Sequence, residues 1–115
     1  MVTRNAFVPD RGDAVWINLD PQAGREQSGR RPALVLSPKA YNAKVGLAIF
    51  CPITRHTKQY PFEVPIPVGS PVNGVVLSDQ VKSLDWRARE AQLLARLPDD
   101  IVQEVLRRLA PLLRP

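Results

Sequence analysis

Hydrophobic residues recur with the period of a β-strand near the start of the chain. Val15, Ile17 and Leu19 are separated by single residues of other types, and Gly12 precedes them. A period of two predicts a strand that buries one face. The next stretch, PQAGREQSGRR at 21–31, is almost without apolar residues, so it predicts a polar loop longer than the usual hairpin turn. Long polar loops on small β folds often carry function.

Two continuous apolar runs follow this loop. Residues 32–36 and 47–53 each lack alternation, which is typical of strands buried on both faces. Pro52 lies near the end of the second run and predicts a bulge or strand end just before Thr54, because proline cannot donate to a strand ladder.

Three weaker strand patterns complete the β-rich part of the chain. In 62–66, apolar residues alternate with Glu63 and proline, which predicts an edge strand. A fifth strand is expected to begin at 74–77 and to continue toward Val81, and a sixth is expected at 91–97.

The period changes at the C-terminus, where 98–113 reads PDDIVQEVLRRLAPLL. Its apolar residues fall at spacings of three and four, which predicts an amphipathic helix. Asp99 and Asp100 suit the positive end of its dipole. We expect the apolar stripe to pack on the core, with a partner or dimer surface as the alternative.

Five to six short strands and one terminal helix predict a small, strongly curved β-barrel, mainly β or, in looser terms, α+β. The 115 residues allow one domain, with the barrel at about 9–97 and the helix at about 98–113. Apolar residues make up 44% and charged residues 23%, the balance of a globular protein.

A single cysteine, Cys51, and a single histidine, His56, limit the chemistry of the chain. They exclude an intrachain disulfide and a structural zinc site, and they fit a reducing cytoplasm. No apolar run approaches the roughly 20 residues that span a bilayer, so no membrane association is expected.

The positive charge is concentrated in one third of the sequence. The net charge is +5, yet residues 21–62 contain seven bases and one acid, so the rest is slightly negative. The general interpretation is a solvated basic surface. Because this charge lies beside a glycine-containing loop, it favours a site for a polyanion.

Several kinds of hydrolysis are disfavoured by the residues. A two-metal nuclease needs converging carboxylates, and no spacing groups the aspartates. A cysteine nucleophile would be Cys51 with His56 as base, but Cys51 lies in an apolar strand, where cysteines are usually inert. No nucleophile-elbow sequence supports a serine triad.

Metal-free chemistry on RNA remains, in which the ribose 2′-hydroxyl is the nucleophile. The protein must then supply a group that takes or orients the 2′-OH proton, donors for the phosphorane oxygens, and a proton for the 5′ oxygen. Arginine suits the second task, because its fork of donors matches phosphate. Arg30 and Arg31 follow the loop and enter a strand, although Arg31 could instead form an ion pair with Asp20 or Asp79.

Four ordered segments resemble one known family. These segments are GDAVWINLDP, EQSGRRPALVLSP, CPITRHTKQYPFEV and GVVLSDQVKSLDWR. Together they closely resemble the MazF (MazF/PemK-like) family of toxins from bacterial toxin–antitoxin pairs, from about Pro9 to Arg89. The resemblance implies an SH3-like barrel that works as a homodimer and cuts single-stranded RNA at short sequences. It also implies no metal or other cofactor, 2′,3′-cyclic phosphate and 5′-hydroxyl products, growth arrest, and inhibition by an acidic, MazE-like antitoxin.

The resemblance also implies site residues. The family's catalytic arginine and threonine correspond to Arg31 and Thr54, and its loop glutamate corresponds to Glu26, which is expected to accept the 2′-OH proton or contact a base. The residues expected to contact RNA are Arg25, Gln27, Arg30, Lys58, Tyr60, Gln80 and Lys82.

Two alternatives of other classes remain open. The same barrel occurs in CcdB-like toxins, which bind DNA gyrase without cleaving anything, and basic charge alone also fits a plain RNA- or DNA-binding module. His56 lies where the family usually has an uncharged residue. Histidine is a natural general acid, but the family works without one at this position.

Overall fold

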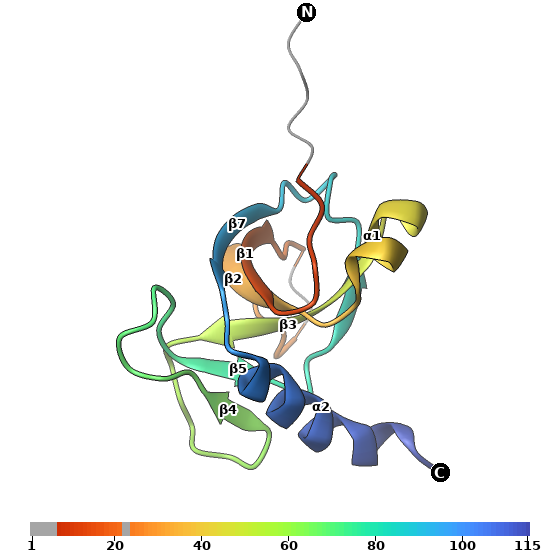
Figure 1. Cartoon of the computed structure of the whole chain (residues 1–115). Coiled ribbons are helices and arrows are strands. Elements are labelled where there is room, and N and C mark those ends of the chain that lie inside the picture. The colour runs from red at the N-terminus through yellow and green to blue at the C-terminus, as the bar shows by residue number, and fades with distance from the viewer. Residues whose placement is uncertain (1–6, 22–23) are drawn as a thin grey trace, which may run out of the picture.

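Seven strands pair antiparallel in one curled sheet, in which β3 pairs with three other strands (Figure 1). The computed structural model describes residues 7–21 and 24–115, so residues 22–23 of the predicted loop lie outside it. The path of neighbouring strands is β4-β5-β3-β2-β1-β7, and β6 also pairs with β3. The elements are β1 (Asp13–Asn18), β2 (Arg30–Val35), α1 (Lys39–Val45), β3 (Ala48–Thr54), β4 (Glu63–Pro65), β5 (Val75–Leu77), β6 (Lys82–Leu84), β7 (Gln92–Arg96) and α2 (Asp99–Leu113).

The predicted closed barrel of five to six strands is wrong in two respects. The strand expected from 74 toward Val81 ends at Leu77, and a further strand that was not expected, β6, begins at Lys82. β5 and β6 pair with different parts of β3. The sheet is also open within the described residues, since its path ends at β4 and at β7. β4 contains Pro65, which has no N–H for a further strand, so the prediction of an edge strand is confirmed.

β3 continues through Pro52 without the predicted bulge and ends at Thr54. Its residues 48–50 pair with β6 and its residues 53–54 pair with β5. Leu36 N donates to the carbonyl of Ile49 on the opposite edge of β3, so by alternation the nitrogen of Pro52 faces the edge that β6 and β5 share. The missing donor therefore falls between the two pairings.

Two hydrophobic clusters cover the two faces of the sheet. One contains Leu34, Ile53 and Val76 and is covered by α2, whose Val102 and Val105 are buried. The other surrounds Val15, Ile17, Phe50 and Trp86. Burying such side chains contributes about 1.5–3 kcal/mol each, so both clusters stabilise the sheet. The expectation that the apolar stripe of the terminal helix packs on the core is confirmed.

α1 was not predicted, because 39–45 lacks a helical hydrophobic pattern. The helix is held instead by Asn42, whose fully buried side chain donates to the carbonyls of Pro9 and Ser37. Trp86 Nε1 donates to the carbonyl of Asn42 at 3.0 Å. No helix in the described part of the chain has the length and apolar character to cross a membrane.

Gly74 allows β5 to approach the end of β3. Its φ is +117°, and a Cβ built there would lie 2.1 Å from the carbonyl oxygen of Thr54. We expect Gly74→Ala to lower the free energy of unfolding by about 3 kcal/mol or more, measured by urea denaturation, because the backbone must shift.

Gly46→Ala is the matched control for this substitution. Gly46 also has a positive φ, +84°, but a Cβ at this position would meet no described atom within 4 Å beyond its chain neighbours. The free energy of unfolding of Gly46→Ala should therefore fall only by the cost of a left-handed backbone at a non-glycine residue, about 1 kcal/mol. Equal losses in the two variants would contradict the close approach.

Candidate functional site

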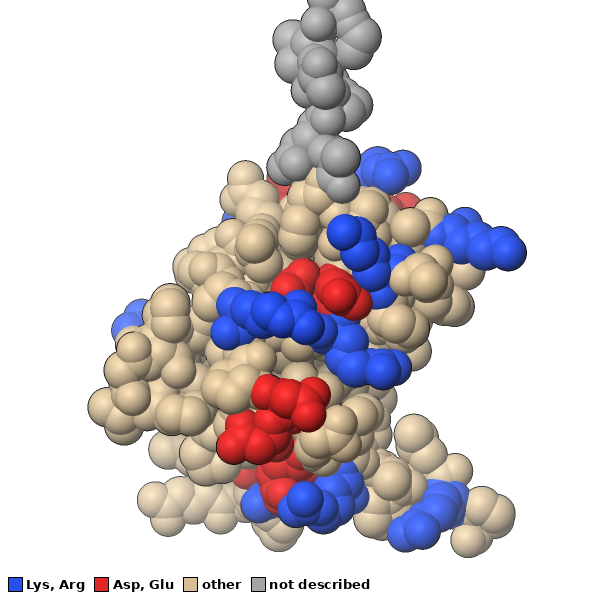
Figure 2. All heavy atoms as spheres, viewed as in Figure 1, with Lys and Arg blue, Asp and Glu red and all other residues tan. Residues whose placement is uncertain are grey.

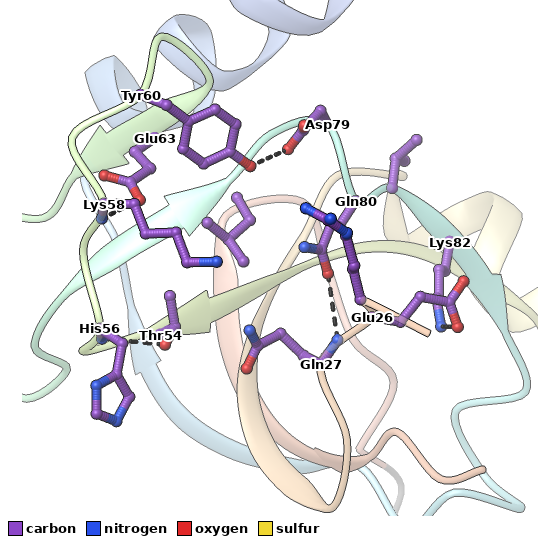
Figure 3. Close-up of a pocket in the computed structure, with 13 residues that line it drawn as sticks. Glu26, Gln27, Thr54, His56, Lys58, Tyr60, Glu63, Asp79, Gln80 and Lys82 are labelled. Carbon is purple, nitrogen blue, oxygen red and sulfur yellow. Dashed lines mark hydrogen bonds and ion pairs between the residues drawn. The ribbon is translucent and has the colours of Figure 1, made fainter. Parts of the chain in front are cut away.

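A cavity of about 600 Å³ opens beside the C-terminal end of β3 (Figure 3). Four segments distant in sequence line it: the loop before β2, the end of β3, the turn between β3 and β4, and the linker between β5 and β6. Most of the predicted site residues lie here. They are Arg25, Glu26, Gln27, Thr54, Lys58, Tyr60, Gln80 and Lys82.

Thr54 is the last residue of β3 and is only 4% exposed, yet its side chain borders the cavity. The backbone N–H of His56 donates to Thr54 Oγ1 at 3.1 Å. Because that bond occupies a lone pair of the oxygen, the hydroxyl proton can still be donated to a ligand. Figure 3 shows the His56 ring at the rim of the cavity.

Arg31 lies in a neighbouring hollow of about 460 Å³, together with Arg30, Trp16 and Ile53. β2 begins with these arginines and pairs antiparallel with β3, which ends at Thr54, so both candidate catalytic residues lie at the same end of adjacent strands. His56 lines both hollows.

The Arg31 guanidinium is anchored on one side. Its Nε donates to the carbonyl of Ser28 at 2.9 Å, which fixes the plane of the group. The alternative ion pair with Asp20 or Asp79 is not among the salt bridges formed by residues 7–21 and 24–115. This arrangement leaves Nη atoms available for the planar recognition of a phosphate.

Arg30 has a different set of contacts. Its Nη2 donates to the carbonyl of Glu90 at 2.8 Å and to Gln92 Oε1 at 2.9 Å. These bonds tie the start of β2 to the segment that enters β7.

The loop before β2 is fastened across the cavity to the β5–β6 linker and β6. Lys82 Nζ donates to Glu26 Oε1 at 2.8 Å, and the backbone N–H of Gln27 donates to Gln80 Oε1 at 3.3 Å. The second of these bonds is drawn in Figure 3. Two residues of the DQVKS segment therefore hold the loop that carries Glu26.

Two acidic residues of the cavity were missed by sequence reasoning. Tyr60 Oη donates to Asp79 Oδ1 at 2.7 Å, and Glu63, a charged residue on an expected edge strand, is 6% exposed. Burial, the hydrogen bond to Asp79 and the charges of Asp79 and Glu63 raise the pKa of Tyr60. The phenol therefore stays protonated at neutral pH and acts as a donor. Asp79 stands beside Gln80 in the matched segment, and that adjacency was the available signal.

The cavity is lined by side chains of both signs of charge: Arg25, Lys58 and Lys82 are basic, and Glu26, Glu63 and Asp79 are acidic. Acidic and basic side chains also lie next to each other on the face of the molecule seen in Figure 2. Burial and, secondarily, the charge of Asp79 raise the pKa of the Cys51 thiol to about 12, as expected for an inert cysteine. Within the described residues, no group of three or more His, Cys, Asp or Glu side chains could hold a metal ion.

The hydrogen bond between Tyr60 and Asp79 can be tested by titration. Tyr41→Phe leaves Tyr60 as the single tyrosine, because the chain contains two. In that background, Asp79→Asn should lower the pH at which the 295 nm phenolate absorbance appears by at least about one unit, since a charged acceptor is removed. Asp100→Asn, in the first turn of α2, is the control and should leave the titration unchanged. An unchanged titration in Asp79→Asn would contradict the bond.

Comparison with known proteins places this geometry in a family. Residues 10–113 match the family of PemK-like, MazF-like toxins of type II toxin–antitoxin systems. The endoribonuclease toxin MazF of Escherichia coli K12 is 53% identical over 91 residues, which cover 79% of each chain. Crystallised MazF of Deinococcus radiodurans is 56% identical with a TM-score of 0.90, covering 93% of this chain and 97% of that one. A MazE–MazF structure from the same organism matches at 50% identity and a TM-score of 0.82, covering 93% of this chain and 97% of that one. With this sequence, this sheet and this cavity, the chain belongs to the PemK-like, MazF-like toxins of type II toxin–antitoxin systems.

Proposed function

We propose that this chain is an endoribonuclease toxin that cuts single-stranded RNA at short sequences without a metal ion. The observation that carries the proposal is the cavity in which Thr54, Glu26 and two lysines meet beside the anchored Arg31. Relatives covering most of the chain are named endoribonucleases, which supports the same reaction over CcdB-like binding of gyrase.

The reaction follows from these groups. The ribose 2′ oxygen attacks phosphorus, the bond from phosphorus to the 5′ oxygen breaks, and a 2′,3′-cyclic phosphate and a 5′-hydroxyl result. Glu26 takes or orients the 2′-OH proton, and the leaving 5′ oxygen receives a proton from water. The Arg31 guanidinium and the Thr54 hydroxyl donate to the phosphorane oxygens, where negative charge grows in the transition state.

RNA is held by the basic and polar rim of the cavity. Lys58 and Lys82 contact phosphates, and Tyr60, Gln27 and Gln80 offer hydrogen-bonding groups to bases. The ion pair between Lys82 and Glu26 means that an incoming phosphate competes with the carboxylate for this lysine. Arg25 and Arg30 add positive charge, Arg30 from the neighbouring hollow.

The partners follow from the same surface. MazF of D. radiodurans is seen bound to MazE, and we propose that an acidic, MazE-like antitoxin covers the cavity of this chain. We also propose that the chain works as a homodimer in the cytoplasm, where cleaved RNA arrests growth.

The cleavage chemistry can be tested in the presence of EDTA. The wild-type protein should cut single-stranded RNA there, and both Arg31→Ala and Thr54→Ala should lower the rate by about 100-fold or more while remaining folded. Ligation-based sequencing of the fragments should find 5′-hydroxyl ends and a common short sequence at the cuts.

Two further variants serve as controls. Thr54→Ser keeps the hydroxyl and should retain most of the activity, and Arg107→Ala removes an exposed arginine of α2 and should change nothing. An absolute requirement for Mg²⁺, or full activity in Arg31→Ala, would rule out this mechanism.

Competition with the antitoxin should depend on salt. An acidic antitoxin peptide should displace a labelled RNA, and its affinity should fall at least about tenfold between low and high salt, because exposed charges are screened. Fluorescence anisotropy measures this directly. An affinity that does not change with salt would contradict an electrostatic contact.

A further inference from the structure

Glu63 is an acidic residue whose charge does not suit a site for a polyanion. It lies in the first position of β4, is 6% exposed and borders the cavity. A carboxylate there repels phosphate, and burying an unpaired charge is costly. The Glu63 carboxylate is therefore expected to have a role other than direct contact with RNA.

The hydrogen bonds of this carboxylate all point back into the turn that follows β3. Thr57 Oγ1 donates to Oε1, Lys58 N donates to Oε2 at 2.8 Å, and Gln59 N donates to Oε1 at 2.9 Å. One side chain thus collects donors from three successive residues. Figure 3 shows the bond between Lys58 and Glu63.

The turn needs such support to keep its shape. Gln59 has a φ of +57°, a conformation that non-glycine residues rarely adopt and that persists only when surrounding contacts impose it. On the other side of the turn, Arg108 of α2 donates to the carbonyls of Pro61 and Glu63. The turn is therefore fixed from within by Glu63 and from outside by α2.

The ionised form of Glu63 makes these bonds. Burial raises the pKa of the Glu63 carboxyl, but hydrogen bonds from Thr57 and from the backbone of Lys58, Gln59 and Tyr60 lower it more, so the net shift is downward. The carboxylate is therefore present at neutral pH as a full acceptor.

We propose that Glu63 is a positioning residue, which holds Lys58 and Tyr60 in the arrangement that receives RNA. Both side chains project from the turn into the cavity (Figure 3). This role rests on the proposed RNA cleavage. In this role Glu63 acts through these two side chains and needs no contact of its own with RNA.

Glu63→Gln is the direct test, because it keeps the shape of the side chain but replaces one acceptor oxygen with an NH₂ group. That group faces a backbone N–H, so at least one bond to the turn is lost. We expect kcat/KM for a short RNA to fall about 10- to 100-fold, mainly through a higher KM, since misplaced Lys58 and Tyr60 weaken binding.

Asp13→Asn is the matched control. Asp13 is also a buried carboxylate, 7% exposed, and it accepts hydrogen bonds from Asp10 N and from Arg96, both at 2.9 Å. It is not among the residues lining the cavity, so its amide variant should lose stability without changing KM. Equal changes of KM in the two variants would overturn the proposal.

A double-mutant cycle separates positioning from general destabilisation. If Glu63 acts through Lys58, the effect of Glu63→Gln on KM should shrink in the Lys58→Ala background. Fully multiplicative effects would show that Glu63 does not act through Lys58, which would overturn its positioning of that lysine. If Glu63→Gln does not fold, Thr57→Val removes one donor of the same cluster and should raise KM a few-fold.

Hydrogen exchange gives a readout that does not depend on activity. The amides of Lys58 and Gln59 should be protected in the wild type and exchange faster in Glu63→Gln but not in Asp13→Asn. Faster exchange with unchanged cleavage would overturn the positioning role of Glu63 and leave the proposed function intact. Absence of RNA cleavage by the wild type would instead overturn the proposed function, and this role with it.

Discussion

The pairing of β3 with three other strands is the constraint on which the rest of the structure depends. β2 lies along one edge of β3, while β6 and β5 share the other edge in succession. β2 carries Arg31 at its start, and β3 carries Thr54 at its end. Antiparallel pairing therefore brings these two positions to the same end of adjacent strands. The buried residues of β3, Phe50 and Ile53, also join the two hydrophobic clusters.

The elements with a clear pattern could be predicted from the sequence, and the elements held by tertiary contacts could not. The terminal helix was expected at 98–113 and lies at Asp99–Leu113, because its apolar period reports directly on one packed face. α1 has no such period and depends on the buried amide of Asn42. The open sheet was missed for a similar reason, since closure depends on what edge strands meet and not on how each strand is patterned.

The candidate site divides in the same way. Residues taken from the matched segments gather in one cavity, apart from Arg30 and Arg31, which line its neighbour. Asp79 and Glu63 were missed because their roles are hydrogen bonds to the turn after β3, and such partners are set by the folded chain. Acidic residues beside the basic ones also explain why the count of bases and acids in residues 21–62 overstates the positive charge around the cavity.

Pro52 has a consequence that reaches beyond its own strand. Its nitrogen has no hydrogen to donate, and it faces the edge of β3 between the end of β5 and the start of β6. The intervening residues 78–81 have no ladder to follow at that point. Asp79, Gln80 and Val81 from this stretch line the cavity. The cavity thus opens beside the one point of β3 where the absence of an N–H donor coincides with a break in strand pairing.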